Sequence, residues 1–182
     1  MMFFNAANAK HAKFRETHEN LLNVSFYQKV CFYSRIQQPD RSGSGVARVG
    51  IATAGGNVPY VSSSQMNNGI SGFVDEEPSH AANTLTVARN GSVASTFYQP
   101  IDYCASPDDG RILHPKFNMN QYLGLFLAVL IEKEKYRYDY GRKFGTKRMK
   151  ETLLKLPAKP DGNPDWQFIE NYIKGLPYSG NL

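Results

Sequence analysis

The chain has 182 residues, of which 41% are hydrophobic and 20% are charged, a composition typical of a folded domain and not of a disordered chain. Its 21 lysines and arginines outnumber its 16 aspartates and glutamates, which favours a polyanionic partner. The longest apolar run, at 122–131, is about half as long as the roughly 20 residues of a membrane span, and no export signal precedes it. We therefore expect a cytoplasmic protein without a membrane role.

Residues 1–23 are mixed and polar, and two segments with clearer signals follow them. Residues 25–36, SFYQKVCFYSRI, are rich in aromatic and β-branched residues and predict a strand, and the turn-forming residues 37–45 follow it. The cysteines Cys31 and Cys104 match no metal or redox spacing, so we expect both to be small core residues.

Short strands separated by turn signals are predicted from 46 to about 116, as a twisted sheet or an open barrel. Asn90-Gly91 between two strand-like runs predicts a hairpin with a two-residue type I′ turn.

Helices are predicted after this β-rich half, which makes the fold α+β. Residues 118–136 predict a helix with an apolar stripe of Tyr122, Leu125, Phe126, Val129 and Leu130. A second helix is predicted at about 147–155, capped by Thr146. The third follows a cap and first turn formed by Asn163, Pro164 and Asp165, with an apolar face of Trp166, Ile169, Tyr172 and Ile173.

Motifs for catalysis are lacking. The sequence has no HExxH pair, no phosphate loop, no Asn/Asp-Pro-Pro-aromatic motif for amino methylation and no [DE]-x-Lys triplet of metal-dependent nucleases. Acidic runs at 75–77 and 108–109 suit Mg²⁺ in principle but are typical of solvated turns. We expect no catalysis by the chain alone, no cofactor and no bound metal.

Positive charge is concentrated between Lys133 and Lys150. Eight cations and two anions in this segment give 8 − 2 = +6, against +5 for the whole chain. Such a run is either a solvated face or a phosphate-binding surface. Two features favour the second: Gly141 and Gly145 let the backbone approach a phosphate, and a helix N-terminus is predicted beside them. For Tyr136, packing at a helix end is the preferred interpretation.

A second polar cluster lies at 59–73, PYVSSSQMNNGISGF. Asparagine and glutamine can read adenine edges, and serine can contact bases or phosphates. Taken alone, the cluster is equally typical of an Asn-Gly turn.

Four segments in this order resemble target-recognition domains of restriction–modification specificity subunits, type I-like and type IIB-like. They are NVPYVSSSQMNNGISGFV, NTLTVARNGSVASTFYQP, YRYDYGRKFGTKRMKETLLKLP and DGNPDWQFIENYIKGLPYS. The resemblance implies a sequence-reading module for double-stranded DNA. It also implies a partner adenine methyltransferase subunit, which flips and methylates a base, and often a restriction subunit.

The resemblance runs from about residue 55 to the end of the chain. Residues 1–50 lack the family's usual opening, a strand leading into a Gly/Lys/Arg-containing loop, of which RSGSG with Arg41 resembles a degraded form. We therefore separate a divergent segment, 1–45, from a recognition domain with closing helices, 46–182. No second recognition half is present, so two copies pair, another chain supplies that half, or the chain is a fragment.

From these observations we predict two groups of DNA-binding residues. Phosphate contacts are expected from Arg137, Arg142, Lys143, Lys147, Arg148 and Lys150. Candidates for base reading are Ser63, Gln65, Asn67, Asn68, Arg89, Asn90 and Tyr140.

Two other functions stay open from the sequence. One is a small metal-dependent enzyme for a phosphorylated or nucleotide substrate, with Asp108, Asp109 or His114 as the working groups. The other is a degenerate half-subunit that only assembles with protein partners.

Overall fold

The computed structural model describes residues 26–28, 32–34, 56–106, 110–139, 141–177 and 179–181. Among these residues most strands precede the helices, and one short strand lies between the last two helices. The strands are β1 (Phe26–Gln28), β2 (Phe32–Ser34), β3 (Val58–Val61), β4 (Ile70–Val74), β5 (Thr84–Ala88), β6 (Thr96–Gln99), β7 (Cys104–Ala105), β8 (Gly110–Pro115) and β9 (Leu154–Leu156). The helices are α2 (Gln121–Lys133), α3 (Thr146–Glu151) and α4 (Trp166–Lys174), with 3₁₀ turns η1 (Asn67–Gly69), η2 (Glu134–Arg137) and η3 (Ser179–Asn181). This arrangement confirms the predicted α+β class.

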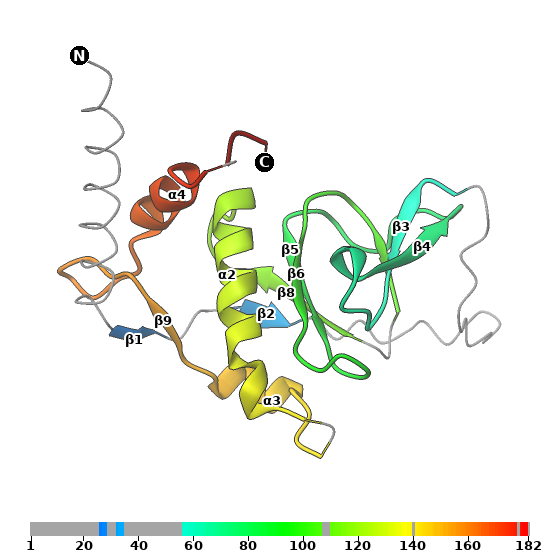
Figure 1. Cartoon of the computed structure of the whole chain (residues 1–182), viewed down its shortest axis with the longest axis horizontal. Coiled ribbons are helices and arrows are strands. Elements are labelled where there is room, and N and C mark those ends of the chain that lie inside the picture. The colour runs from blue at the N-terminus through cyan, green and yellow to red at the C-terminus, as the bar shows by residue number, and fades with distance from the viewer. Residues whose placement is uncertain are drawn as a thin grey trace, which may run out of the picture.

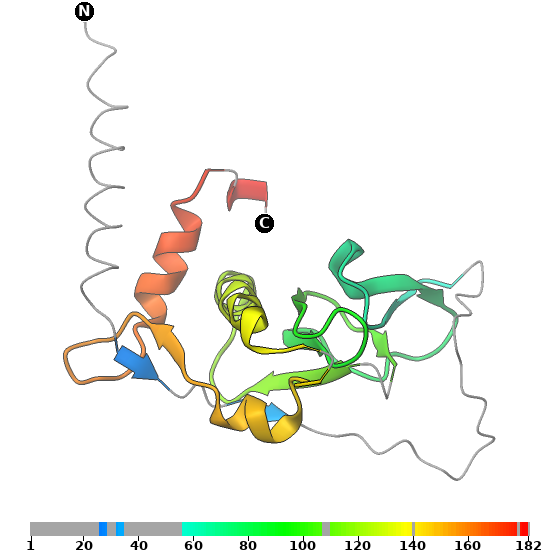
Figure 2. The same cartoon turned by 60° about the horizontal axis from the view of Figure 1, so that its bottom comes forward.

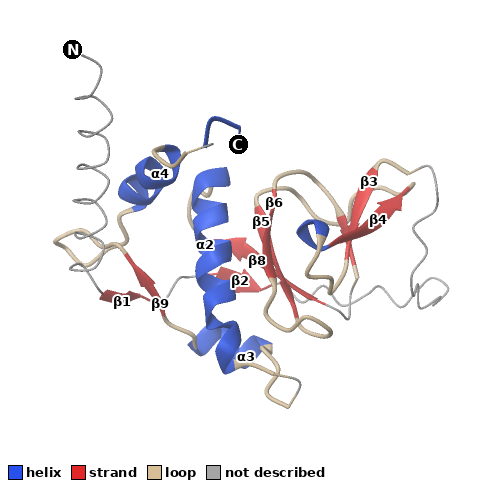
Figure 3. Cartoon of the chain, viewed as in Figure 1, coloured by secondary structure: helices blue, strands red, loops and turns tan. Residues whose placement is uncertain are grey.

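The strands form three sheets, which are separated in Figure 3. Their orders are β2-β8-β5-β6, β4-β3-β7 and β1-β9. Within the four-stranded sheet β5 is antiparallel to both of its neighbours, and all five of its residues are buried. This strand is therefore the centre of the fold.

Helix α2 lies between the four-stranded sheet and α4 in both views of the molecule (Figures 1 and 2). Its buried residues are Leu123, Gly124, Leu127, Ala128 and Ile131. At Gly124 the helix touches Tyr98 of β6 so closely that an added Cβ would lie 2.2 Å from the ring. Glycine is needed there because the helix and the sheet meet at this point.

Helix α4 is fixed to α2 through side chains near the N-terminal end of α2. Asn120 caps α2 and donates a hydrogen bond of 2.9 Å to Glu170. Trp166 stacks on Phe117 with 4.3 Å between the ring centroids, while Ile169 is fully buried. The predicted apolar face of the last helix therefore docks on α2, and no described helix has the length and apolar character to cross a membrane.

Several predictions of local structure were wrong. The predicted stripe of α2 is displaced, because Val129 is 54% exposed while Leu127 is fully buried. The single strand at 25–36 is replaced by two short strands, β1 and β2, which pair with β9 and β8. Helix α3 ends at Glu151, and the end of its predicted span forms β9.

Caps and turns also differ from the predictions. Gly145 is the N-cap of α3 in place of Thr146, whose hydroxyl accepts a hydrogen bond from Arg111. Asp165 caps α4, accepting from the Phe168 amide at 3.0 Å. The β5–β6 hairpin is confirmed, but its strands are joined by residues 89–95. Only Gly91 of the Asn90-Gly91 pair has a positive φ, so the turn is not type I′.

Candidate nucleic-acid interface

The basic segment begins at Lys133 in the last turn of α2, and its next two cations, Lys135 and Arg137, bond to other side chains. The Lys135 ammonium donates to the buried Ser95 hydroxyl at 3.0 Å. Arg137 pairs with Glu134 at 2.7 Å, and this hydrogen bond and charge raise the pKa of Arg137. Arg137 is exposed, but its charge is balanced by a neighbouring carboxylate.

Residues 141–145 form a tight loop that presents Arg142 to solvent. The Arg142 amide donates to the Asp139 carboxylate at 2.6 Å, and Phe144 anchors the loop in the core. Phe144 stacks on Tyr138, whose hydroxyl is 2.8 Å from that of Thr152. Tyr138 therefore has a packing role that keeps the loop in place.

The basic loop contacts the loop between β5 and β6. The Lys143 ammonium donates to the Asn90 side-chain oxygen at 3.0 Å, and both residues are half-buried. Arg148 of α3 in turn donates to the Lys143 carbonyl oxygen at 2.9 Å. In Figure 1 the β5–β6 loop and the loop before α3 project on the same side of the molecule.

The loop that follows β3 contacts the β5–β6 loop from its other side. The Ser92 amide donates to the Ser63 carbonyl oxygen at 3.5 Å, and a Cβ on Gly91 would lie 3.3 Å from that oxygen. Residues 62–67, 89–92 and 141–148 thus adjoin in series. We call them the three-loop surface.

The structure gives Asn68 a role in holding its loop. Its amide donates to the Tyr98 carbonyl oxygen at 3.0 Å and to the Gln99 side chain at 3.2 Å. Gln99 is buried and donates back to the Asn68 carbonyl oxygen and to Thr86. These bonds attach the Asn68 side-chain amide to strand β6. Gln65 and Asn67 are instead exposed to solvent.

The other predicted residues fall into three groups. Lys147, Arg148 and Lys150 are exposed on α3. Arg89 is half-exposed in the β5–β6 loop. Tyr140 lies outside the described residues, as do Arg41, Cys31, Asp108 and Asp109. The structure thus brings most, but not all, of the predicted residues onto the three-loop surface.

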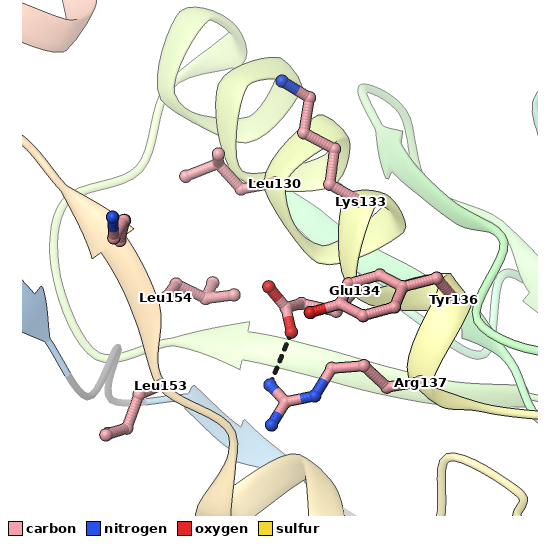
Figure 4. Close-up of a pocket in the computed structure, with 8 residues that line it drawn as sticks. Leu130, Lys133, Glu134, Tyr136, Arg137, Leu153 and Leu154 are labelled. Atoms are coloured by element: carbon pink, nitrogen blue, oxygen red, sulfur yellow. Dashed lines mark hydrogen bonds and ion pairs between the residues drawn. The ribbon is translucent and has the colours of Figure 1, made fainter. Parts of the chain in front are cut away.

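The exposure of two large side chains, Met66 and Tyr136, was not predicted from the sequence. Met66 is 64% exposed beside Gln65, and an apolar residue in a polar run gave no signal. Tyr136 is 83% exposed, so its predicted packing role was wrong. It borders a pocket of about 400 Å³, and Figure 4 shows the Arg137–Glu134 pair among the side chains that line it. Lining residues are Leu130, Lys133, Glu134, Tyr136, Arg137, Leu153, Leu154 and Lys155.

Metal-binding geometry is absent from the described part of the chain, where no group of three or more His, Cys, Asp or Glu side chains could hold an ion. His114 lies on β8, and its charge adds to burial in lowering the pKa of His80. Cys104 is buried as predicted and contacts the Glu77 carbonyl oxygen at 3.4 Å.

Comparisons with known proteins agree on one family. The model of the type I restriction modification DNA specificity domain matches residues 51–177. Over 119 residues the chain is 40% identical to the "Type II restriction enzyme BgcI specificity subunit S.BcgI" of Heyndrickxia coagulans, a match that covers 65% of this chain and 35% of that protein.

A solved structure has a similar fold, the S subunit of a type I restriction-modification system from M. genitalium. The TM-score is 0.56 at 17% identity, over 94% of this chain and 42% of that one. The chain thus spans about a third of the curated relative and less than half of the structural one. These matches confirm the resemblance seen in the four sequence segments.

Proposed function

This chain belongs to the family of type I restriction modification DNA specificity domains, and we propose that it selects a sequence in double-stranded DNA for a partner modification enzyme. The observation that carries the proposal is the bond between Lys143 and Asn90, which joins a cationic loop to a loop with base-reading side chains. Phosphate contacts fix the register of a protein on DNA, and neighbouring amides can then read base edges.

The partners follow from this role. A methyltransferase subunit would carry out the chemistry at the selected site, and a restriction subunit would cleave DNA there. The relatives' printed names, which describe specificity subunits, support a role in site selection. We propose that the chain itself is non-catalytic and acts in the cytoplasm. The metal-dependent enzyme is not favoured, because the family model and the matched relatives are those of specificity domains and specificity subunits.

We propose one recognition domain over 46–182, to which part of the segment 1–45 also belongs. The pairing of β1 with β9 and of β2 with β8 supports this assignment. A second recognition half, from a second copy of this chain or from another subunit, would complete the site, because both relatives are more than twice as long as their matched regions.

The test is selection of duplexes from a randomised DNA pool by the purified chain, at two salt concentrations. We expect a sequence motif, with log affinity falling by about 0.9 per phosphate contact for each tenfold rise in salt. Binding without a motif would contradict sequence selection by this chain and place specificity in a partner subunit. Absence of binding at low salt would contradict the proposal and favour the protein-assembly module.

A further inference from the structure

Met66 is an exposed apolar side chain on a loop whose polar neighbours are candidates for base reading. It is 64% exposed, and Gln65 and Asn67 on either side are also exposed. Single exposed apolar side chains are common on protein surfaces, so exposure alone carries no function. The backbone of this loop supplies the second observation.

The Met66 backbone is held at both of its polar groups. Its amide donates to the Ser64 hydroxyl at 3.0 Å, and its carbonyl oxygen accepts from the Gly69 amide at 2.9 Å. The Gly69 carbonyl oxygen in turn accepts from the Ser62 amide at 2.9 Å. The loop is therefore closed on itself with the Met66 side chain projecting outward.

Three successive residues after Met66 have left-handed backbone conformations. The φ angles are 52° at Asn67 and 56° at Asn68, values that are uncommon outside glycine, and 78° at Gly69, which glycine adopts readily. The bonds from Asn68 to Tyr98 and to the buried Gln99 stabilise this unfavourable backbone. A strained segment that is fixed from the core is a feature of functional sites, where it positions a side chain in advance.

The chemistry of the loop matches an A·T base pair in the major groove. Thymine presents a C5-methyl group there, and adenine presents a donor and an acceptor that suit an Asn or Gln amide. Methionine is flexible and polarisable, so it packs well on a methyl group. The Ser63–Ser92 contact keeps the loop beside Asn90 and Lys143, where phosphate contacts would bring it to the groove.

We propose that Met66 is a specificity-determining residue that packs on a thymine methyl group, while Gln65 or Asn67 reads the adenine of the same or the next pair. This inference rests on the proposed function of the chain as a DNA-recognition domain. It adds an apolar contact to a set of candidates that was entirely polar.

The experiment uses the full chain and the duplex selected from the randomised pool. Each thymine is replaced in turn by uracil, which differs only in lacking the C5-methyl group. The wild-type protein should lose about four-fold in affinity at one thymine position, the value of one buried methyl group. Met66→Ala and Met66→Gln should each bind the thymine and uracil duplexes equally well, whereas Met66→Leu should keep most of the difference.

The outcomes separate this inference from the proposed function. If a motif is selected but the wild-type protein tolerates uracil at every position, or the motif has no thymine, the inference is wrong and the DNA-recognition role stands. Uracil sensitivity that persists in Met66→Ala would also overturn it. If no motif is selected, the proposed function fails first, and the methyl contact fails with it.

Discussion

The Lys143 ammonium group donates a hydrogen bond of 3.0 Å to the side-chain oxygen of Asn90, 53 residues earlier in the chain. This bond links a residue expected to contact phosphate with one expected to read bases. A lysine that contacts both DNA and a reading loop should influence affinity and sequence preference together. Exposed cations of α3 should influence affinity alone.

The variants Lys143→Gln and Lys147→Gln separate an effect on affinity alone from an effect on both affinity and sequence preference. Each should reduce the salt dependence of binding by about one phosphate contact. Only Lys143→Gln should also reduce the ratio of affinities for the selected duplex and a singly mismatched one, because it removes the bond from Lys143 to Asn90. Titrations of both duplexes at two salt concentrations measure both effects. Equal ratios for the two variants would show that the Lys143–Asn90 bond does not influence reading.

Arg142→Ala should weaken binding to all sequences about equally. The side chain is exposed on a loop whose backbone is held by Asp139, so its loss removes a phosphate contact without moving the loop. Selection from the randomised pool with this variant should return the wild-type motif at lower affinity. A changed motif at unchanged affinity would assign Arg142 to base reading.

Gly124→Ala should destabilise the fold by about 1–3 kcal/mol, typical of overpacking in a core. The added Cβ would lie 2.2 Å from the Tyr98 ring, so the helix or the sheet must move. Gly180→Ala is the control, since no atom lies within 4 Å of its added Cβ. Urea unfolding of the three proteins measures the difference, and equal midpoints for all would contradict the close approach of α2 to β6.

Asp165→Ala should cost about 1 kcal/mol of stability, because its carboxylate accepts from the Phe168 amide at the start of α4. Asn163→Ala removes the residue that the sequence suggested as a cap. Asn163 bonds to the exposed Asp161 instead, so the cost should be smaller. Thermal unfolding orders the two variants, and a larger effect of Asn163→Ala would restore the original assignment of the cap.

Stability should fall as the solution becomes acidic, in part through His80. Burial, and then the charge of His114, lower its pKa below the usual value of 6.5. The folded state therefore binds fewer protons than the unfolded state below about pH 6.5. The stability that His80 contributes is complete above that pH and is lost as pH falls toward the lowered pKa. His80→Gln should reduce the difference in urea midpoint between pH 7.5 and pH 5.5, and an unchanged difference would exclude His80 as a cause.

Local signals predicted the α+β class, the hairpin and the docking face of α4, because each depends on neighbouring residues. The buried face of α2 was wrong because apolar residues occur all around that helix. Its orientation depends on the contact of Gly124 with Tyr98, which is distant in sequence. Likewise, β9 forms through its pairing with β1, more than a hundred residues earlier.

At the candidate site, too, local features were predicted and long-range contacts were not. The charge run and the polar cluster were visible in the sequence, but the contacts that join them are long-range. Asn68 has the chemistry of a base reader, and only its bonds to Tyr98 and Gln99 reveal its holding role. Met66 was overlooked because an isolated methionine has no pattern, and its position follows from a backbone that only the fold defines.

The serial contact of the three loops has an evolutionary consequence. Loops that touch one another cannot diverge independently, since a new side chain in one alters the support of the next. New target sites in such a domain would then arise more readily by exchange of whole segments, from β3 to α3, than by accumulation of single changes in one loop. Recombination between related genes would preserve the mutual fit of the loops while changing the side chains that they expose.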